Sequence, residues 1–149
     1  MIFRETPLSG AYVVDIEKLA DTRGFFARTW CQAEFEKQGL ISRLVQASLS
    51  FNKHKGTLRG LHFQKVPSKE AKLVRVTQGA IFDVIVDLRP DSSTFLKYYS
   101  INLNAQNHSA LYEKAWDFAW ARKNRVADGH PTVCPDGGHS AWAFIASGQ

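Results

Sequence analysis

Short segments in which apolar and polar residues alternate are the feature that most constrains the fold of this chain. In the clearest of them, residues 43–51, two sets of side chains point to opposite faces: Val45, Ala47, Leu49 and Phe51 against Gln46, Ser48 and Ser50. A period of two residues is typical of a β-strand, because successive side chains leave opposite sides of a sheet. The pattern therefore predicts a protein built mainly of strands.

Further strands are expected between turn residues, at 10–16, 25–30, 57–64, 71–78, 80–88 and 94–103. Gly79 separates two Val- and Ile-rich segments and predicts a hairpin. Residues 32–38 predict one helix, with Phe35 inward and Gly39 at its end. Several short strands at regular spacing predict an all-β sandwich or barrel with one short helix. Beyond Tyr112 no clear period remains.

Length and composition indicate a single domain without a membrane segment. The chain has 149 residues, which is enough for one core that buries about two-thirds of the unfolded surface. No apolar run approaches the roughly 20 residues that a membrane helix needs, and no signal-peptide pattern begins the chain. We therefore expect a cytoplasmic protein that does not bind membranes.

The net charge of +5 comes from Lys and Arg residues that are scattered singly. Binding to a phosphate backbone usually requires a clustered basic stripe, so nucleic acid is not expected as a partner. A small anion such as a nucleoside diphosphate fits a modest positive excess equally well, and so does an ordinary solvated surface.

The sequence does not predict a metal, a cofactor or a disulfide. Cys31 and Cys134 lie far apart, and neither belongs to a CxxC motif. The position two residues after His62 is Gln64, so the H-x-H pair of many metal-binding β-barrels is missing. One imidazole without a second close ligand makes a poor site for zinc or iron.

His62, Arg59 and Lys72 are the residues best suited to chemistry. A titratable imidazole beside two cations can take a proton next to the carbonyl of an anionic substrate. Strand alternation would send Arg59 and His62 to opposite faces, but a bulge at Gly60 would turn both toward one cavity. The alternatives are an ordinary core or surface histidine and a strand-end lysine in water.

Three other charged residues allow two interpretations each. Asp83 and Asp87 share one face of their strand, where they could act as paired acid and base. A structural role is favoured for both, with backbone amides or with Arg75 or Arg89 as partners. Arg23 follows a turn and could bind a phosphate bidentately, or it could be an exposed arginine.

Several segments, in the right order, resemble the dTDP-4-dehydrorhamnose 3,5-epimerase family over residues 3–112. They are 21–26 (DTRGFF), 45–46 (VQ), 57–64 (TLRGLHFQ), 72–75 (KLVR), Gly79, 83–89 (DVIVDLR) and 92–95 (SSTF). The resemblance implies a jelly-roll (cupin) barrel that forms a homodimer, uses no metal and acts on a dTDP-4-keto-6-deoxyhexose. Pairing of an N-terminal strand at 3–7 with a neighbour's sheet is one way to form that dimer.

The resemblance also implies roles for individual residues. His62 corresponds to the base that removes the protons at C3 and C5, and Lys72 would stabilise the enolate oxygen with Arg59 beside it. Arg23 and Gln46 would hold the nucleotide. Cationic donors make a proton next to a ketone removable by neutralising the oxyanion that develops.

The chain departs from the family at three places. Ala47 and Ser48 stand where many members carry an asparagine that holds the nucleotide, and Arg28 replaces a glutamate of some subgroups. After Tyr112, the glycine- and histidine-containing segment, the proton-donating tyrosine and the orienting aspartate are not found. Phe118-Ala119-Trp120 only echoes the family's F-x-H stretch.

These departures divide the chain into an epimerase-like barrel, 1–112, and a divergent segment of the same domain, 113–149. We expect the segment to come from a reading-frame shift or a truncation. The primary functional expectation is an epimerase-like enzyme of deoxysugar biosynthesis. The alternatives are a catalytically impaired cupin that binds a sugar nucleotide, and a 3,4-ketoisomerase of the same pathway.

Overall fold

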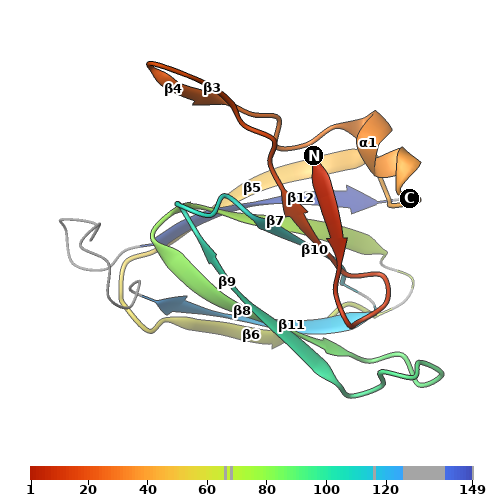
Figure 1. Cartoon of the computed structure of the whole chain (residues 1–149). Helices are drawn as coiled ribbons and strands as arrows, with labels where there is room; N and C mark the ends of the chain where they lie inside the picture. Colours follow the sequence, from red (N-terminus) through yellow and green to blue (C-terminus); the bar gives the residue numbers. More distant parts are fainter. Residues whose placement is uncertain (66, 68, 116, 126–139, 149) are drawn as a thin grey trace.

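Two antiparallel sheets face each other in the computed structural model and enclose a barrel interior (Figure 1). The structure describes residues 1–65, 67, 69–115, 117–125 and 140–148, with the backbone alone at 124, 125, 140, 142 and 144–148. Among these residues the one helix is α1 (Gln32–Lys37). The expected all-β jelly roll with one short helix is confirmed.

Among the described residues, ten strands form the two main sheets, and two more form a small hairpin. The six-stranded sheet has the order β1 (Ile2–Glu5), β2 (Tyr12–Asp15), β10 (Ala110–Lys114), β7 (Glu70–Gln78), β12 (Ser140–Gly148) and β5 (Leu44–Asn52). The four-stranded sheet has the order β6 (Leu58–His62), β11 (Phe118–Arg125), β8 (Ala80–Asp87) and β9 (Tyr98–Asn104). The hairpin pairs β3 (Leu19–Asp21) with β4 (Gly24–Phe26).

Apolar side chains fill both the barrel interior and the outer side of the six-stranded sheet. The interior cluster includes Val13, Val74, Leu111 and Phe118 from both sheets. The residues next to these in β2, β7 and β10 point outward and pack under α1: Val14, Leu73, Ala110 and Tyr112, together with Phe35 and Leu40. Strand alternation therefore sends a buried residue to each face, as expected of a sheet covered on both sides.

One sequence expectation about pairing is wrong. Segments 71–78 and 80–88 do not form a hairpin, because β7 pairs with β10 and β12 while β8 pairs with β9 and β11. Gly79, with a φ of 72°, is the corner at which the chain passes from one sheet to the other. The N-terminal strand β1 pairs with β2 of its own chain and lies at the edge of the sheet. Its pairing with a neighbour's sheet stays a prediction.

The segment after Tyr112 contributes to both sheets. β11 lies between β6 and β8, and β12 lies between β7 and β5. The segment beyond Tyr112 therefore forms strands, although its sequence shows no clear alternation of apolar and polar residues. The strand expected at 25–30 is also shorter than predicted, since β4 ends at Phe26.

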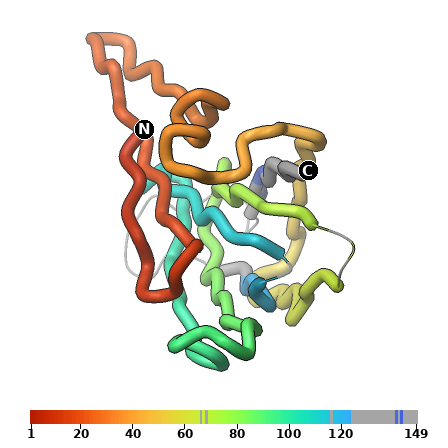
Figure 2. The backbone as a smooth tube through the Cα atoms, turned by 90° about the vertical axis from the view of Figure 1, so that its right-hand side faces the viewer, coloured from red at the N-terminus to blue at the C-terminus, as the bar shows by residue number. Residues whose placement is uncertain are grey.

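The β3–β4 hairpin, here called the arm, extends away from the two main sheets (Figures 1 and 2). Its apolar residues Leu19 and Phe26 are 70% and 71% exposed. In both views the arm lies at the side of the six-stranded sheet, while β6 lies in the opposite sheet.

No helix in the described part of the chain is long and apolar enough to cross a membrane. Cys31 is not in a disulfide, and Cys134 lies outside the described residues. The cytoplasmic location stays a prediction.

Candidate active site

A bulge in β6 places Arg59 and His62 on the same face. His62 pairs with Trp120 of β11, and Arg59 pairs with Arg122, so three steps along β6 match two steps along β11. The extra residue lies at Gly60, whose φ is +117°. The predicted bulge is therefore confirmed, and it turns both side chains to the side of the sheet on which Trp120 and Arg122 lie.

Trp120 lies at the centre of this group of side chains. Its ring centroid is 4.7 Å from that of His62, and the Lys72 Nζ atom lies 5.0 Å over the ring. The Arg122 guanidinium lies 4.2 Å over the same ring. Because Lys72 belongs to β7, the indole joins the two sheets across the barrel interior. Sequence reasoning noted Trp120 but missed these contacts, although Phe118, Trp120 and Arg122 alternate as inward residues of a strand do.

Lys72 is held more firmly than a strand-end lysine in water. Its ammonium lies 3.4 Å from the Glu70 carboxylate, and the side chain is only 14% exposed. Glu70 also accepts a hydrogen bond from the Gln64 amide. His62, by contrast, is exposed to solvent, as a base that meets an incoming ligand must be.

A buried ion cluster contacts Trp120 through Arg122. Arg122 Nε donates to Asp83 at 2.9 Å, and its Nη2 donates to Glu113 at 2.6 Å. The side chains are 2% exposed or less, and one oxygen of each carboxylate has no hydrogen-bond partner among the described residues. Burial raises the pKa of Asp83 to about 7 and also raises that of Glu113. The cluster therefore holds a proton more readily than two exposed carboxylates would.

Gln46 lies in the same row of the six-stranded sheet as Lys72. Both residues have Ala146 of β12 as their cross-strand partner, so they lie two strands apart on one face. Two strand spacings amount to about 10 Å, which suits contacts with two ends of one ligand. Asn52, at the other end of β5, accepts a hydrogen bond from Arg59 at 2.8 Å.

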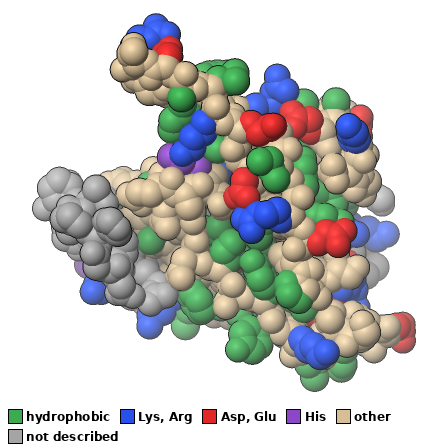
Figure 3. All heavy atoms as spheres, in the orientation of Figure 1, with side chains coloured by type: hydrophobic (Ala, Val, Ile, Leu, Met, Phe, Trp, Pro, Cys, Tyr) green, Lys and Arg blue, Asp and Glu red, His purple; other side chains and the backbone are tan. Residues whose placement is uncertain are grey.

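Within one chain, Arg23 does not belong to the group of side chains around Trp120. It lies in the turn of the arm, its side chain is 87% exposed, and its guanidinium binds Asp21 at 2.6 Å. Figure 3 shows the arm standing clear of the body of the molecule. If Arg23 contacts a ligand at His62, the two must come from different copies of the chain.

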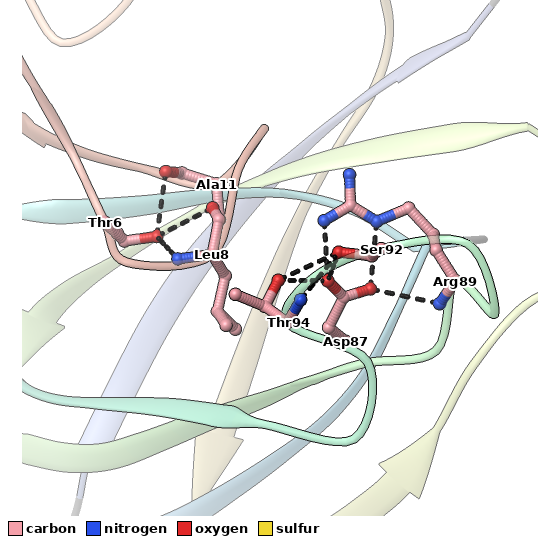
Figure 4. A network of polar contacts seen from close by, with 7 residues as sticks. All are labelled: Thr6, Leu8, Ala11, Asp87, Arg89, Ser92 and Thr94. Carbon is pink, nitrogen blue, oxygen red and sulfur yellow. Dashed lines mark hydrogen bonds and ion pairs between the residues drawn. The ribbon is translucent and has the colours of Figure 1, made fainter.

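The two aspartates of β8 have structural roles. Asp87 accepts hydrogen bonds from Arg89, Ser92 and Thr94 (Figure 4). These bonds, Arg89 first, hold its pKa well below the usual range. The expected partner Arg89 is thus confirmed for Asp87, whereas Asp83 binds Arg122 rather than Arg75 or Arg89.

Of the tyrosines nearest to the sequence break, Tyr112 and Tyr98 do not face the interior, whereas Tyr99 faces it three strands away from His62. Tyr112 is 1% exposed and faces the α1 side of its sheet, where its hydroxyl oxygen accepts a hydrogen bond from the Ile41 backbone N–H. Burial raises its pKa to about 12. Tyr98 is 70% exposed, and Tyr99 packs against the interior cluster.

In the described part of the chain, no three His, Cys, Asp or Glu side chains gather closely enough to hold a metal ion.

The fold and this group of residues define a double-sheet β-barrel with a histidine and several cations facing its interior. A model of the family described as dTDP-4-dehydrorhamnose 3,5-epimerase matches residues 5–115. The enzyme of that name from Methanothermobacter thermautotrophicus is 41% identical over 110 residues, which are 74% of this chain and 58% of that protein. The chain belongs to the dTDP-4-dehydrorhamnose 3,5-epimerase family.

Solved structures agree with this assignment. The Bacillus anthracis enzyme, with TDP and PPi bound, matches with a TM-score of 0.85 and 34% identity, over 99% of this chain and 78% of that one. The Legionella pneumophila enzyme in complex with dTDP-4-keto-L-rhamnose matches with a TM-score of 0.81 and 27% identity, over 99% and 72%. The family model ends at residue 115, whereas the likeness in structure covers 99% of the chain.

The chain spans about three-fifths of the length of the first curated relatives that it matches.

Proposed function

We propose that this chain binds a dTDP-linked 4-keto-6-deoxyhexose and that His62 removes a proton from a carbon next to the keto group. The observation that carries the proposal is the bulge at Gly60, which brings His62 and Arg59 to the same face as Trp120. Through Trp120 these residues meet Lys72 of the opposite sheet. Relatives solved with TDP or with dTDP-4-keto-L-rhamnose support the class of ligand.

The proposed reaction needs only these side chains. The imidazole of His62 accepts the proton from C3 or C5, and the electrons of the broken C–H bond move to the keto oxygen to form an enolate. Lys72 and Arg59 supply positive charge near that oxygen, which lowers the barrier when the charge develops in a partly buried site. Return of the proton to the carbon completes the exchange.

The nucleotide would be held by residues farther from the base. Gln46 is in line with Lys72 across the sheet, and we assign it to the nucleotide. Arg23 would reach the ligand from a second copy, because the arm extends away from its own barrel. This assignment makes the proposed site dependent on a homodimer.

Solvent exchange tests the role of His62. The wild-type chain, incubated with a dTDP-4-keto-6-deoxyhexose in heavy water, should incorporate deuterium into the sugar at C3 and C5. Mass spectrometry and proton NMR measure this incorporation. His62→Ala should slow the exchange by at least ~100-fold, the lower bound for a positioned general base. His54→Ala, in the exposed turn before β6, is the matched control and should exchange like the wild type. Equal exchange by the wild type and His62→Ala would reject the assignment.

A second candidate function is binding of the nucleotide sugar without inversion. It is favoured by the position of Tyr112, which faces away from the barrel interior. A base on one face of the sugar can return a proton to that face, whereas inversion needs a donor opposite. The same experiment separates the candidates. Exchange at C3 and C5 with retained configuration would show a base that works without an opposite donor, and exchange at C3 alone would indicate a 3,4-ketoisomerase. No exchange at all would indicate a protein that only binds the nucleotide sugar.

A further inference from the structure

Lys72 and His62 share one aromatic neighbour. The indole of Trp120 lies 4.7 Å from the imidazole and 5.0 Å from the Lys72 Nζ atom. An ammonium over an aromatic face is attracted by the negative potential of the ring. The ring and the Glu70 carboxylate at 3.4 Å thus both hold the ammonium of Lys72.

The two reactive side chains differ in how a ligand can approach them. His62 is exposed, whereas the Lys72 side chain is 14% exposed. A keto oxygen that accepts a hydrogen bond from Lys72 must lie about 3 Å from Nζ. Because the indole and the Glu70 carboxylate already lie on the ammonium, we expect a hexose to gain that position by displacing the ring.

The indole also contacts a second cation, Arg122. Arg122 lies 4.2 Å over the ring, and the guanidinium is itself fixed by ion pairs with Asp83 and Glu113. Because these three charged side chains are almost fully buried, Arg122 cannot move away without leaving two carboxylates unpaired. The indole therefore contacts a rigid group of buried charges as well as Lys72.

We propose that Trp120 caps Lys72 and thereby selects against the hexose part of a nucleotide sugar. A nucleoside diphosphate binds without disturbing the cap, whereas the sugar of a dTDP-hexose has to displace it. This inference rests on the proposed function, because it takes Lys72 as the partner of the keto oxygen. The opposite role, a platform on which the sugar stacks, predicts the opposite effect of removing the ring.

The test compares two ligands, dTDP and a dTDP-4-keto-6-deoxyhexose, by calorimetry at one pH. The quantity of interest is the ratio of their dissociation constants. Trp120→Ala should shift this ratio toward the sugar nucleotide by about tenfold, the size expected for loss of a partly desolvated cation–π contact. The affinity for dTDP alone should change less than twofold. Trp30→Phe, a tryptophan change in the outer cluster under α1, is the control and should leave the ratio as it is.

A second variant keeps the test decisive if Trp120→Ala does not fold. Trp120→Phe retains a ring on the same stem but a smaller one, and it should shift the ratio in the same direction by a smaller factor. A shift toward dTDP in either variant would show a stacking platform, and an unchanged ratio would show no cap; both results overturn the inference.

Deuterium exchange separates failure of the inference from failure of the proposed function. If the ratio shifts as expected but no variant exchanges protons, the cap exists and the proposed chemistry does not. If exchange depends on His62 while the ratio is unaffected by Trp120, the chemistry stands and the cap is wrong.

Discussion

At the scale of single residues, the unusual feature is a concentration of charge inside a small barrel. Asp83, Glu113 and Arg122 are all nearly inaccessible to water. Burying charges is costly unless they are paired, and two carboxylates share one guanidinium here. Two of these residues, Glu113 and Arg122, lie beyond Tyr112. That segment therefore carries an ionic partner for Asp83 of the family-like region.

The raised pKa of Asp83 predicts how stability depends on pH. Its pKa is about 7 in the folded chain against 3.8 for an ordinary aspartate, so the folded state binds more protons between these values. The free energy of unfolding should therefore fall as pH rises from about 4 to about 7. Asp87 has a lowered pKa, so its contribution to the free energy of unfolding rises with pH, but only below about pH 4.

Urea unfolding at several pH values checks this expectation. Asp83→Asn removes the titrating group and should flatten the decline between pH 4 and pH 7, while Asp91→Asn, in the exposed loop after β8, should retain it. A decline of equal slope in Asp83→Asn would assign the effect to other groups.

At the scale of elements, the site depends on the close approach of β6 and β11. A Cβ atom built on Gly60 would lie 2.5 Å from the Trp120 carbonyl oxygen and 2.7 Å from the Ala121 Cα atom. Both are backbone atoms, so neither can rotate away, and the φ of +117° is one that side chains rarely adopt. The bulge thus requires glycine for two independent reasons.

Gly60→Ala should therefore separate the strands at the site. We expect a loss of stability of about 2–4 kcal/mol, the range for overpacking combined with backbone strain, together with loss of His62-dependent exchange. Gly56→Ala is the control, since a Cβ there meets nothing within 4 Å although its φ is also positive. Wild-type exchange by Gly60→Ala would mean that the bulge does not position the base.

The sequence predicted individual strands better than their partners. Residues 43–51 and 71–78 lie almost exactly where β5 and β7 do, because alternation and turn residues are local signals. The hairpin at Gly79 failed because a glycine corner between two sheets and a tight turn within one sheet have the same local composition. β11 was missed because Arg122, an inward residue, looks like a surface residue until Asp83 and Glu113 are seen beside it.

The candidate site was predictable in part for the same reason. The bulge at Gly60 followed from the odd spacing of Arg59 and His62, and the structure contains it. Trp120 and Lys72 lie in different sheets and are 48 residues apart in the sequence, so no local pattern could reveal their contact. The origin of the segment 113–149 stays a prediction.

At the scale of the whole molecule, exposed apolar side chains lie together on one face of β5. The outward residues Val45, Leu49 and Phe51 of the edge strand β5 are 54%, 68% and 54% exposed. The apolar residues of the arm are exposed as well. Contiguous exposed apolar patches often mark interaction surfaces, so these exposed side chains make β5 a candidate interface. Since Arg23 also lacks a ligand-facing position in its own chain, we expect a second copy to cover this surface.

Sedimentation equilibrium checks the expected homodimer. The wild-type chain should be dimeric at micromolar concentration, and Leu49→Lys should shift it to the monomer by placing a charge on the covered face. Leu58→Lys is the matched control, because Leu58 is 64% exposed but lies on β6 of the other sheet. A wild-type monomer, or a dimer that tolerates Leu49→Lys, would contradict this placement.

A dimer formed through the exposed face of β5 would make the stability of the folded chain depend on protein concentration. If two copies unfold together, mass action adds about 1.4 kcal/mol per mole of dimer for each tenfold rise in concentration. The melting temperature would then increase on concentrating the sample and decrease on dilution, without any change in sequence or buffer. If the chain dimerises through β5, its free energy of unfolding therefore has no single value and depends on the concentration of the protein itself.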